Sequence, residues 1–249
     1  MKITPFEPGG TKTFVPLLCP GYHCEDVRTM SALLQIMDEK SADHPGARML
    51  ATLDHVGQAF YTSGHTIDAN ELDPFPDDDE VIGEDDVPPL PGFATRLDRL
   101  VKAASAVTLD QISNRLWWTG EDRPSFFALQ DEPDAILDRE DIYIQAVPVS
   151  RAWEMMAAFP NGYFHGDFSP MENLVLARHL EEAFGYALFG IGASYIGFRR
   201  TSSFSVERLG DLAAFVISLH AVSNEPDLLW KVRMTLEASD LLFLAYIAR

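Results

Sequence analysis

The chain has 249 residues, of which 47% are hydrophobic, and it carries 38 acidic against 19 basic side chains for a formal net charge of -19. This length and apolar content allow a substantial buried core. The charge opposes binding to nucleic acid and to anionic membranes by long-range repulsion, so it excludes both as partners and favours a basic or cationic partner.

The N-terminal sequence MKITPFEPGG has no hydrophobic signal core, and the chain has no run of 18 uncharged apolar residues. We therefore expect a cytoplasmic protein. Cys19 and Cys24 would close a very small loop as a disulfide, so we expect two thiols. Four-coordinate zinc needs more ligands than this pair with His23, and no second Cys or His cluster follows, so we expect no metal.

The first third of the chain mixes strand and helix patterns. Residues 13–18 are predicted to form a short strand. Residues 25–39 keep apolar side chains at helical spacing and are predicted to form a helix. Residues 48–61 favour strand, either as one long strand or as a hairpin with a turn at Gly57.

An acidic, proline-containing segment follows. Residues 68–86 contain ten acidic side chains and no basic one, and breaker residues continue to Gly92. Such charge density predicts a solvated loop or linker without apolar anchors. We therefore divide the chain into an N-terminal α/β region (1–67), the linker (68–92) and a C-terminal α+β domain (93–249). One continuous domain with a single sheet is the alternative.

The middle of the chain begins with two helical pieces within residues 93–117. Residues 125–130 are predicted to form a strand. Residues 141–149 (DIYIQAVPV) have the clearest strand pattern, and Pro148 marks either an edge strand or a strand end.

The densest structural signals lie between Trp153 and Arg200. Ser169 provides an N-cap, Pro170 the first helical position and Glu172 the acid of a capping box, while Gly185 is typical of a left-handed C-cap. These residues predict a helix that ends at Gly185. Two short strands, 186–192 and 195–198, are expected after it, as a hairpin or a bent strand.

The last segments are a helix over residues 205–222, with His220 at the edge of the core, and a helix that starts near Asp227. The terminal run LLFLAYIAR, 241–249, is apolar on all sides and must be covered. A chain end usually lies at the surface, so we expect coverage by a second copy in a homodimer. Threading of this run into the central sheet is the alternative.

Two sequence motifs resemble known sites but lack their context. HGDFSPMEN, 165–173, resembles the catalytic loop of aminoglycoside and choline phosphotransferases. Asn173, however, lies six residues after Asp167 instead of five, and the capping pattern places it inside a helix. GIGASYIG, 190–197, resembles a dinucleotide-binding loop, but Tyr195 stands at the third glycine position. We therefore expect neither a phosphotransferase site nor a bound dinucleotide, and we expect no other cofactor.

Candidate site residues surround the start of the capped helix. His165 and Asp167 are the candidate catalytic residues, because a histidine near a helix N-terminus can transfer protons or help to hold an anion. The candidate ligand-binding set is Tyr163, His165, Asp167, Arg199 and Arg200. Asp167 as an ordinary turn residue is the structural alternative.

The residues from Val147 to Tyr186 follow the pattern VPV-x-x-x-W, P-x-G-Y-F-x-G-D-x-x-P-x-E, A-R-H-L-E and F-G-Y. This pattern resembles the C-terminal region of a bacterial family of unknown function. The resemblance implies a bacterial cytosolic protein and carries over no catalytic residue.

Together these patterns predict an α+β protein, with a mixed sheet flanked by helices and an acidic insertion. The expected function is non-enzymatic binding of a protein or a small ligand, such as an immunity or inhibitor protein acting on a basic partner. A hydrolase or transferase centred on His165 and Asp167 is the alternative. A convergent pocket there that contains Arg199 or Arg200 would favour the enzyme.

Overall fold

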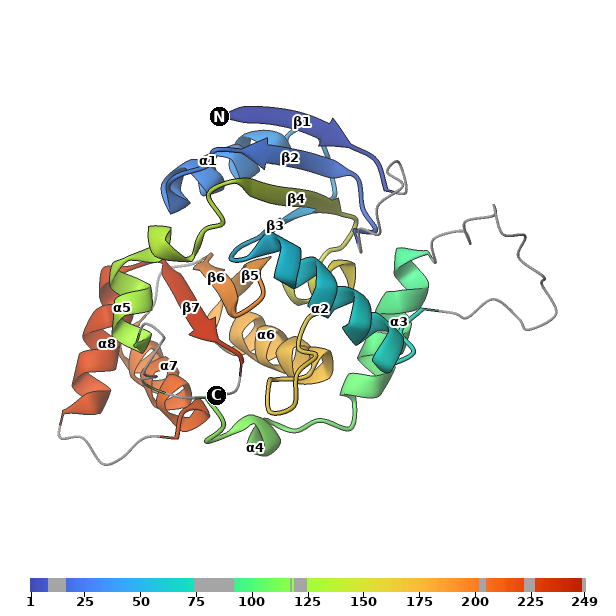
Figure 1. Cartoon of the computed structure of the whole chain (residues 1–249). Coiled ribbons are helices and arrows are strands. Elements are labelled where there is room, and N and C mark those ends of the chain that lie inside the picture. Colours follow the sequence, from blue (N-terminus) through green and yellow to red (C-terminus); the bar gives the residue numbers. More distant parts are fainter. Residues whose placement is uncertain are drawn as a thin grey trace.

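The computed structural model describes residues 1–8, 17–73, 92–116, 118, 125–201, 205–221 and 227–247. In these residues a mixed β-sheet carries helices on both faces (Figure 1). The predicted α+β class is therefore confirmed. Within the described ranges, no helix combines the length and the apolar character needed to cross a membrane.

Seven strands of the described chain form one sheet, in the order β1-β2-β4-β3-β5-β6-β7. The strands are β1 (Lys2–Phe6), β2 (Gly21–Glu25), β3 (Arg48–Thr52), β4 (Asp141–Val147), β5 (Tyr186–Ile191), β6 (Tyr195–Arg200) and β7 (Leu241–Ala245). Only the β3 and β5 pair is parallel. Because β3 lies between β4 and β5, the regions on either side of the acidic segment share one sheet.

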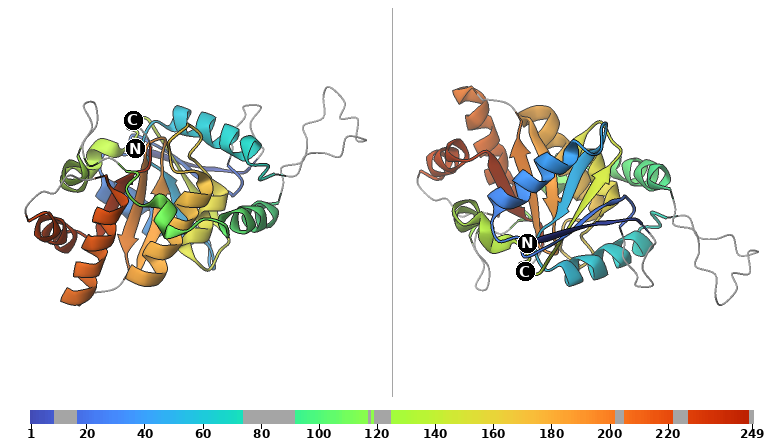
Figure 2. Two further views of the ribbon diagram at one scale, coloured as in Figure 1. Left: turned by 90° about the horizontal axis from the view of Figure 1, so that it is seen from below. Right: turned by 90° about the horizontal axis from the view of Figure 1, so that it is seen from above.

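Helices cover both faces of this sheet (Figure 2). The α-helices are α1 (Met30–Ser41), α2 (Val56–Ala69), α3 (Phe93–Ala104), α4 (Leu109–Ile112), α5 (Phe126–Asp131), α6 (Pro170–Phe184), α7 (Val206–Leu219) and α8 (Leu228–Ala238), and the 3-10 helices are η1 (Pro133–Ile136) and η2 (Ala152–Ala158). Successive residues of β3 point to opposite faces, so Met49 belongs to the core cluster under α1. Leu50 belongs to the larger cluster under α2, α3 and α6.

The structure confirms the capped helix at the centre of the chain. The Ser169 hydroxyl accepts a hydrogen bond from the Glu172 amide, and the Glu172 carboxylate accepts one from the Ser169 amide. At the other end Gly185 adopts φ 68°, the left-handed conformation that favours glycine. The next two strands, β5 and β6, pair antiparallel, so the hairpin is the correct one of the two predicted alternatives.

Two predicted strands are wrong in part or in full. Residues 48–61 contain β3, but the chain then turns at His55 (φ 43°) and continues as α2. Residues 125–130 contain the start of α5 and its N-cap, because the Ser125 side chain accepts a hydrogen bond from the Ala128 amide and caps a helix. A hydroxyl cap thus decides the structure of a segment whose apolar run is too short to distinguish strand from helix.

The N-terminal elements also differ from the predicted ones. The helix expected from residue 25 begins at Met30, after the Thr29 cap. The strand expected at residues 13–18 lies largely outside the described residues, and Leu17 and Leu18 are not in a strand. β1 and β2 were not predicted, because each has only five residues and no clear alternating pattern; β2 pairs with both β1 and β4 in the sheet.

The first residues of the acidic segment are anchored, which corrects the predicted linker boundary. α2 extends to Ala69, Leu72 is buried, and Asp73 forms a two-pronged ion pair with the buried guanidinium of Arg96. These residues provide apolar and ionic anchors, which the composition alone did not indicate. Residues 74–91 lie outside the described part of the chain.

The described part of the C-terminal run, residues 241–247, is covered by its own chain. Leu242, Phe243 and Leu244 are buried in β7 at the edge of the sheet. The amide side chain of Gln130 occupies that edge, since its Nε2 donates to the Phe243 carbonyl oxygen (2.8 Å) and its Oε1 accepts from the Phe243 amide (2.9 Å). Edge strands blocked in this way resist pairing with another chain. The reason for expecting a homodimer through this segment was therefore wrong.

Candidate functional site

The parallel strands β3 and β5 end side by side, and the candidate site lies at this end of the sheet. Thr52 is in register with Ile191, so the segments that follow the two strands emerge together. Asp54 and His55 lead from β3 into α2, and residues 192–194 lead from β5 into β6. The carboxyl ends of parallel strands are a common position for ligand sites in such sheets.

Asp54 anchors the turn between β5 and β6. Its Oδ1 accepts hydrogen bonds from the backbone amides of Ser194 (3.2 Å) and Tyr195 (3.3 Å). A Cβ atom on Gly192 would lie 2.0 Å from this oxygen, so the turn requires glycine there. Asp54 is only 5% exposed, and this burial raises the pKa of its carboxyl. Its other oxygen, Oδ2, has no hydrogen-bond partner among the described residues.

The loop of residues 161–168, before α6, is held by buried amide side chains. Asn161 donates from Nδ2 to the Ala59 carbonyl oxygen of α2 (3.1 Å), and its Oδ1 accepts from the Gly162 amide (3.0 Å). Asn173 of α6 donates to the carbonyl oxygens of Asn161 and Phe168 (3.1 Å and 3.2 Å). The loop is therefore tied to two helices by groups that are themselves inaccessible to solvent.

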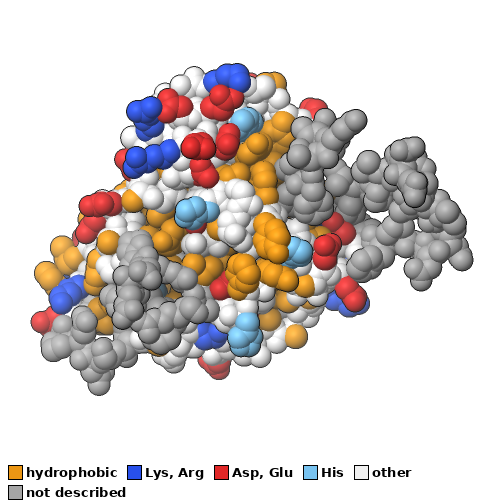
Figure 3. Space-filling model, in the orientation of Figure 1, with side chains coloured by type: hydrophobic (Ala, Val, Ile, Leu, Met, Phe, Trp, Pro, Cys, Tyr) orange, Lys and Arg blue, Asp and Glu red, His pale blue; other side chains and the backbone are white. Residues whose placement is uncertain are grey.

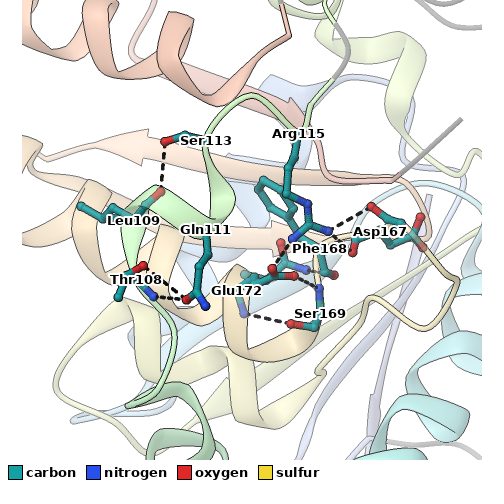
Figure 4. Close-up of polar contacts among 11 residues, drawn as sticks. Thr108, Leu109, Gln111, Ser113, Arg115, Asp167, Phe168, Ser169 and Glu172 are labelled. Atoms are coloured by element: carbon teal, nitrogen blue, oxygen red, sulfur yellow. Dashed lines mark hydrogen bonds and ion pairs between the residues drawn. The ribbon is translucent and has the colours of Figure 1, made fainter.

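Arg115 holds the other side of the same loop (Figure 4). Its guanidinium donates to the carbonyl oxygens of Gly166 (3.2 Å) and Asp167 (3.0 Å) and forms an ion pair with Glu172. It also lies 5.1 Å from the ring centroid of Phe168. One arginine thus joins the loop backbone, an aromatic ring and the capping-box acid of α6.

The structure divides the predicted site residues between two places. Tyr163 and His165 are exposed on the loop, whereas the Asp167 side chain is buried. Asp167 and Asp54 both lie near Tyr246, and burial together with these two carboxyls raises the pKa of that phenol. The structure therefore keeps the loop residues together but withdraws Asp167 from the surface.

Arg199 and Arg200 are at the opposite end of β6 from this loop. Arg199 donates to both carboxylate oxygens of Asp38 in α1 (2.9 Å and 3.0 Å), and Arg200 pairs with Asp240. β6 begins beside the Asp54 turn, and its direction carries both arginines away from that turn. These two arginines therefore do not converge with His165, although such a convergence was the arrangement that would favour the enzyme.

The described residues also provide no metal centre. Among them, no group of three or more His, Cys, Asp and Glu side chains is arranged to hold an ion. Cys19 and Cys24 are free and buried, and burial raises the pKa of their thiols to about 12 and about 11. Buried thiols of this kind are chemically inert.

Four ring side chains from α2 and the loop form a cluster, here called the aromatic patch, in which His65 is half-buried and the other three are exposed: Tyr61, His65, Tyr163 and Phe164. His65 stacks on Tyr163 with ring centroids 5.0 Å apart, and it contacts Tyr61 edge-on at 4.3 Å. Tyr163 also contacts Phe164 at 5.4 Å. Tyr61, Tyr163 and Phe164 are 54%, 41% and 51% exposed.

Sequence reasoning identified Tyr163 but missed the rest of the aromatic patch. Tyr61 and His65 are four residues apart and therefore share one face of α2. That spacing becomes informative only once the segment is read as a helix, and the strand prediction for residues 48–61 concealed it. The contact between α2 and the loop joins residues about a hundred positions apart, which no local pattern indicates.

Comparisons of this chain with protein families, with curated proteins and with solved structures found no match.

Proposed function

We propose that this protein binds a basic protein partner through the aromatic patch. The observation that carries the proposal is the exposure of Tyr61, Tyr163 and Phe164 on one surface, where His65 lies between Tyr61 and Tyr163 and contacts both rings. Tyrosine residues are among the residues that contribute most to protein interfaces, because they bury a large area with few rotatable bonds. Scattered exposed apolar residues need no such explanation, whereas a contiguous cluster does.

The rigidity of the loop supports binding. The amides of Asn161 and Asn173 and the guanidinium of Arg115 fix the backbone on both sides of Tyr163 and Phe164. Gly162 adopts φ 117°, and a Cβ atom there would lie 1.9 Å from the Phe168 carbonyl oxygen. A surface that is already ordered loses little conformational entropy on association, so more of the contact energy appears as affinity.

The distribution of charge supports a basic partner. Orange and pale blue side chains gather over the middle of the face in Figure 3, and most charged side chains lie around them. Asp68 is exposed on α2 one turn beyond His65, so a carboxylate borders the aromatic patch. A net charge of -19 attracts cationic partners, and aromatic rings bind arginine and lysine side chains through cation–π contacts.

The enzymatic alternative has less support. A hydrolase or transferase at His165 and Asp167 would need an accessible Asp167 carboxylate, yet Asp167 is buried and Arg199 pairs with Asp38. Arg115 does lie beside Asp167, but its guanidinium is already engaged by two loop carbonyl oxygens and by Glu172. The thiols of Cys19 and Cys24 are both free, which supports a proposed location in the reducing cytoplasm. Membership of the bacterial family that residues 147–186 resemble stays a prediction.

The test uses a short fluorescein-labelled peptide rich in arginine and glycine, with an acidic peptide of equal length as the comparison. Fluorescence anisotropy is measured with the wild type and with the Tyr61→Ala, Tyr163→Ala double variant. We expect the wild type to bind the basic peptide alone, and the double variant to bind it at least about tenfold more weakly, because both rings lie in the centre of the contact.

Trp230→Ala is the matched control, because Trp230 is 60% exposed on α8, outside the aromatic patch. The control variant should bind like the wild type. Equal binding by wild type and double variant would show that the aromatic patch is not the interface. Equal binding of basic and acidic peptides would show that charge does not select the partner.

A further inference from the structure

A pocket of about 230 Å³ lies far from the aromatic patch, between α1 and the beginning of β3 and β5. The apolar part of its wall includes Met37 of α1, Met49 of β3, Met155 of η2 and Phe189 of β5. Methionine side chains are unbranched and polarizable, so they adapt to ligands of different outline. The volume is below that of pockets for drug-sized molecules, which indicates a small ligand.

Two arginines belong to the polar part of the pocket wall, Arg48 and Arg199. Arg199 holds the Asp38 carboxylate through Nη1, and Arg48 donates from Nε to the Ser150 carbonyl oxygen (2.8 Å). Among the described residues, no carboxylate forms an ion pair with Arg48. The pocket lining thus contains two guanidinium groups and one carboxylate, a net positive charge in a protein of net charge -19.

We propose that this pocket binds a small monocarboxylate with a short aliphatic body. The guanidinium group matches the planar carboxylate in shape and charge, and Arg199 already binds one in Asp38. That ion pair is weakly held, because its side chains are 42% and 61% exposed. The ligand carboxylate binds Arg48, displaces Asp38 from Arg199, and places its aliphatic body against the methionines.

The experiment uses NMR of the full chain labelled with ¹³C at the methionine methyl groups. The chain has 8 methionines, and three of them line the pocket: Met37, Met49 and Met155. Sodium hexanoate is titrated, with hexanol and hexylammonium as probes of the same chain length. We expect hexanoate to shift the three pocket methyl signals in a saturable manner and to leave the exposed Met234 unchanged.

The variants separate charge from fold. Arg48→Gln and Arg199→Gln should each weaken hexanoate binding about tenfold, the effect of losing one charge-assisted contact. Arg28→Gln is the matched control, because Arg28 is an exposed arginine paired with Asp26 outside the pocket, and it should bind like the wild type. Asp38→Asn frees Arg199 from its competing carboxylate and should tighten binding.

A filled pocket provides an independent check. Ala187 also lines the pocket, so Ala187→Leu should abolish the shifts while both arginines remain. Unaltered binding by Arg48→Gln and Arg199→Gln, or equal binding of hexanol, would overturn the role of the charges. Tighter binding of butyl phosphate than of hexanoate would overturn the carboxylate assignment, and shifts at Met234 equal to those at Met37 would show non-specific association.

Discussion

The two ends of the sheet present side chains in different ways. At the carboxyl ends of β3 and β5 the aromatic patch depends on a loop with a left-handed glycine, two buried amides and a clamping arginine. At the other end Arg48 and Arg199 project from regular strands and need no such network. Substitutions that disturb the loop should therefore change both binding and stability, whereas substitutions of the strand arginines should change binding with little effect on stability.

The largest expected effect comes from a substitution that disrupts the loop under the aromatic patch. Gly162→Ala forces a side chain into a left-handed conformation and against the Phe168 carbonyl oxygen, so we expect a loss of at least about 3 kcal/mol in the free energy of unfolding. Urea denaturation measures it. Gly210→Ala is the control, because a Cβ atom there meets no other atom and alanine favours the interior of α7. A Gly162→Ala protein as stable as the wild type would contradict the proposed strain.

Acid should destabilise the protein through His220, which lies at neither of the two ends of the sheet. This effect limits the pH range in which the two ends can be compared. His220 is buried, with Nδ1 2.7 Å from the Val216 carbonyl oxygen, and burial lowers its pKa from 6.5 to about 4. As the pH falls, the unfolded chain therefore binds a proton at His220 at a higher pH than the folded protein does. The contribution of His220 is complete above about pH 6.5 and falls by about 3 kcal/mol as the pH drops toward 4.

Urea denaturation at about pH 7.5 and about pH 4.5 tests this prediction in the wild type and in His220→Gln. The variant should be less stable at neutral pH but less sensitive to acid. If both proteins lose the same free energy between these pH values, His220 is not the responsible group. Binding at the aromatic patch should accordingly be measured near neutral pH, where the fold is most stable.

A smaller effect is expected at the helix start beside the loop. Ser169→Ala removes the hydroxyl that accepts from the Glu172 amide, and we expect a loss of about 1 kcal/mol. Thermal or urea denaturation measures it, with Ser150→Ala, an exposed serine outside the helices, as the control. An unchanged midpoint would show that the cap contributes nothing to stability.

The smallest effect is expected at the strand end. Arg199→Gln removes an exposed ion pair with Asp38, and we expect a change below about 0.5 kcal/mol in the free energy of unfolding. The same urea experiment measures it. A loss comparable to that of Gly162→Ala would erase the contrast between the two ends, since the pocket arginine would then also be a structural residue.

Part of this architecture was predictable from short stretches of sequence. The residues Ser169, Pro170, Glu172 and Gly185 define a helix from one end to the other, because caps are satisfied by neighbours within four residues. β4 was equally clear from its run of β-branched and aromatic residues. The candidate loop could be placed as well, because it had to precede the capped helix.

What the sequence by itself determined is therefore local: the capped helix, the two strand segments after it, the mixed α+β class and the acidic charge. Tertiary structure decided what depends on distant partners: the strand character of β1 and β2, the position of β3 between β4 and β5, and the burial of Asp167. It also separated Arg199 from His165 and brought Tyr61 to Tyr163 through His65. Strand pairing and burial join residues far apart in the chain, and local patterns contain no record of those partners.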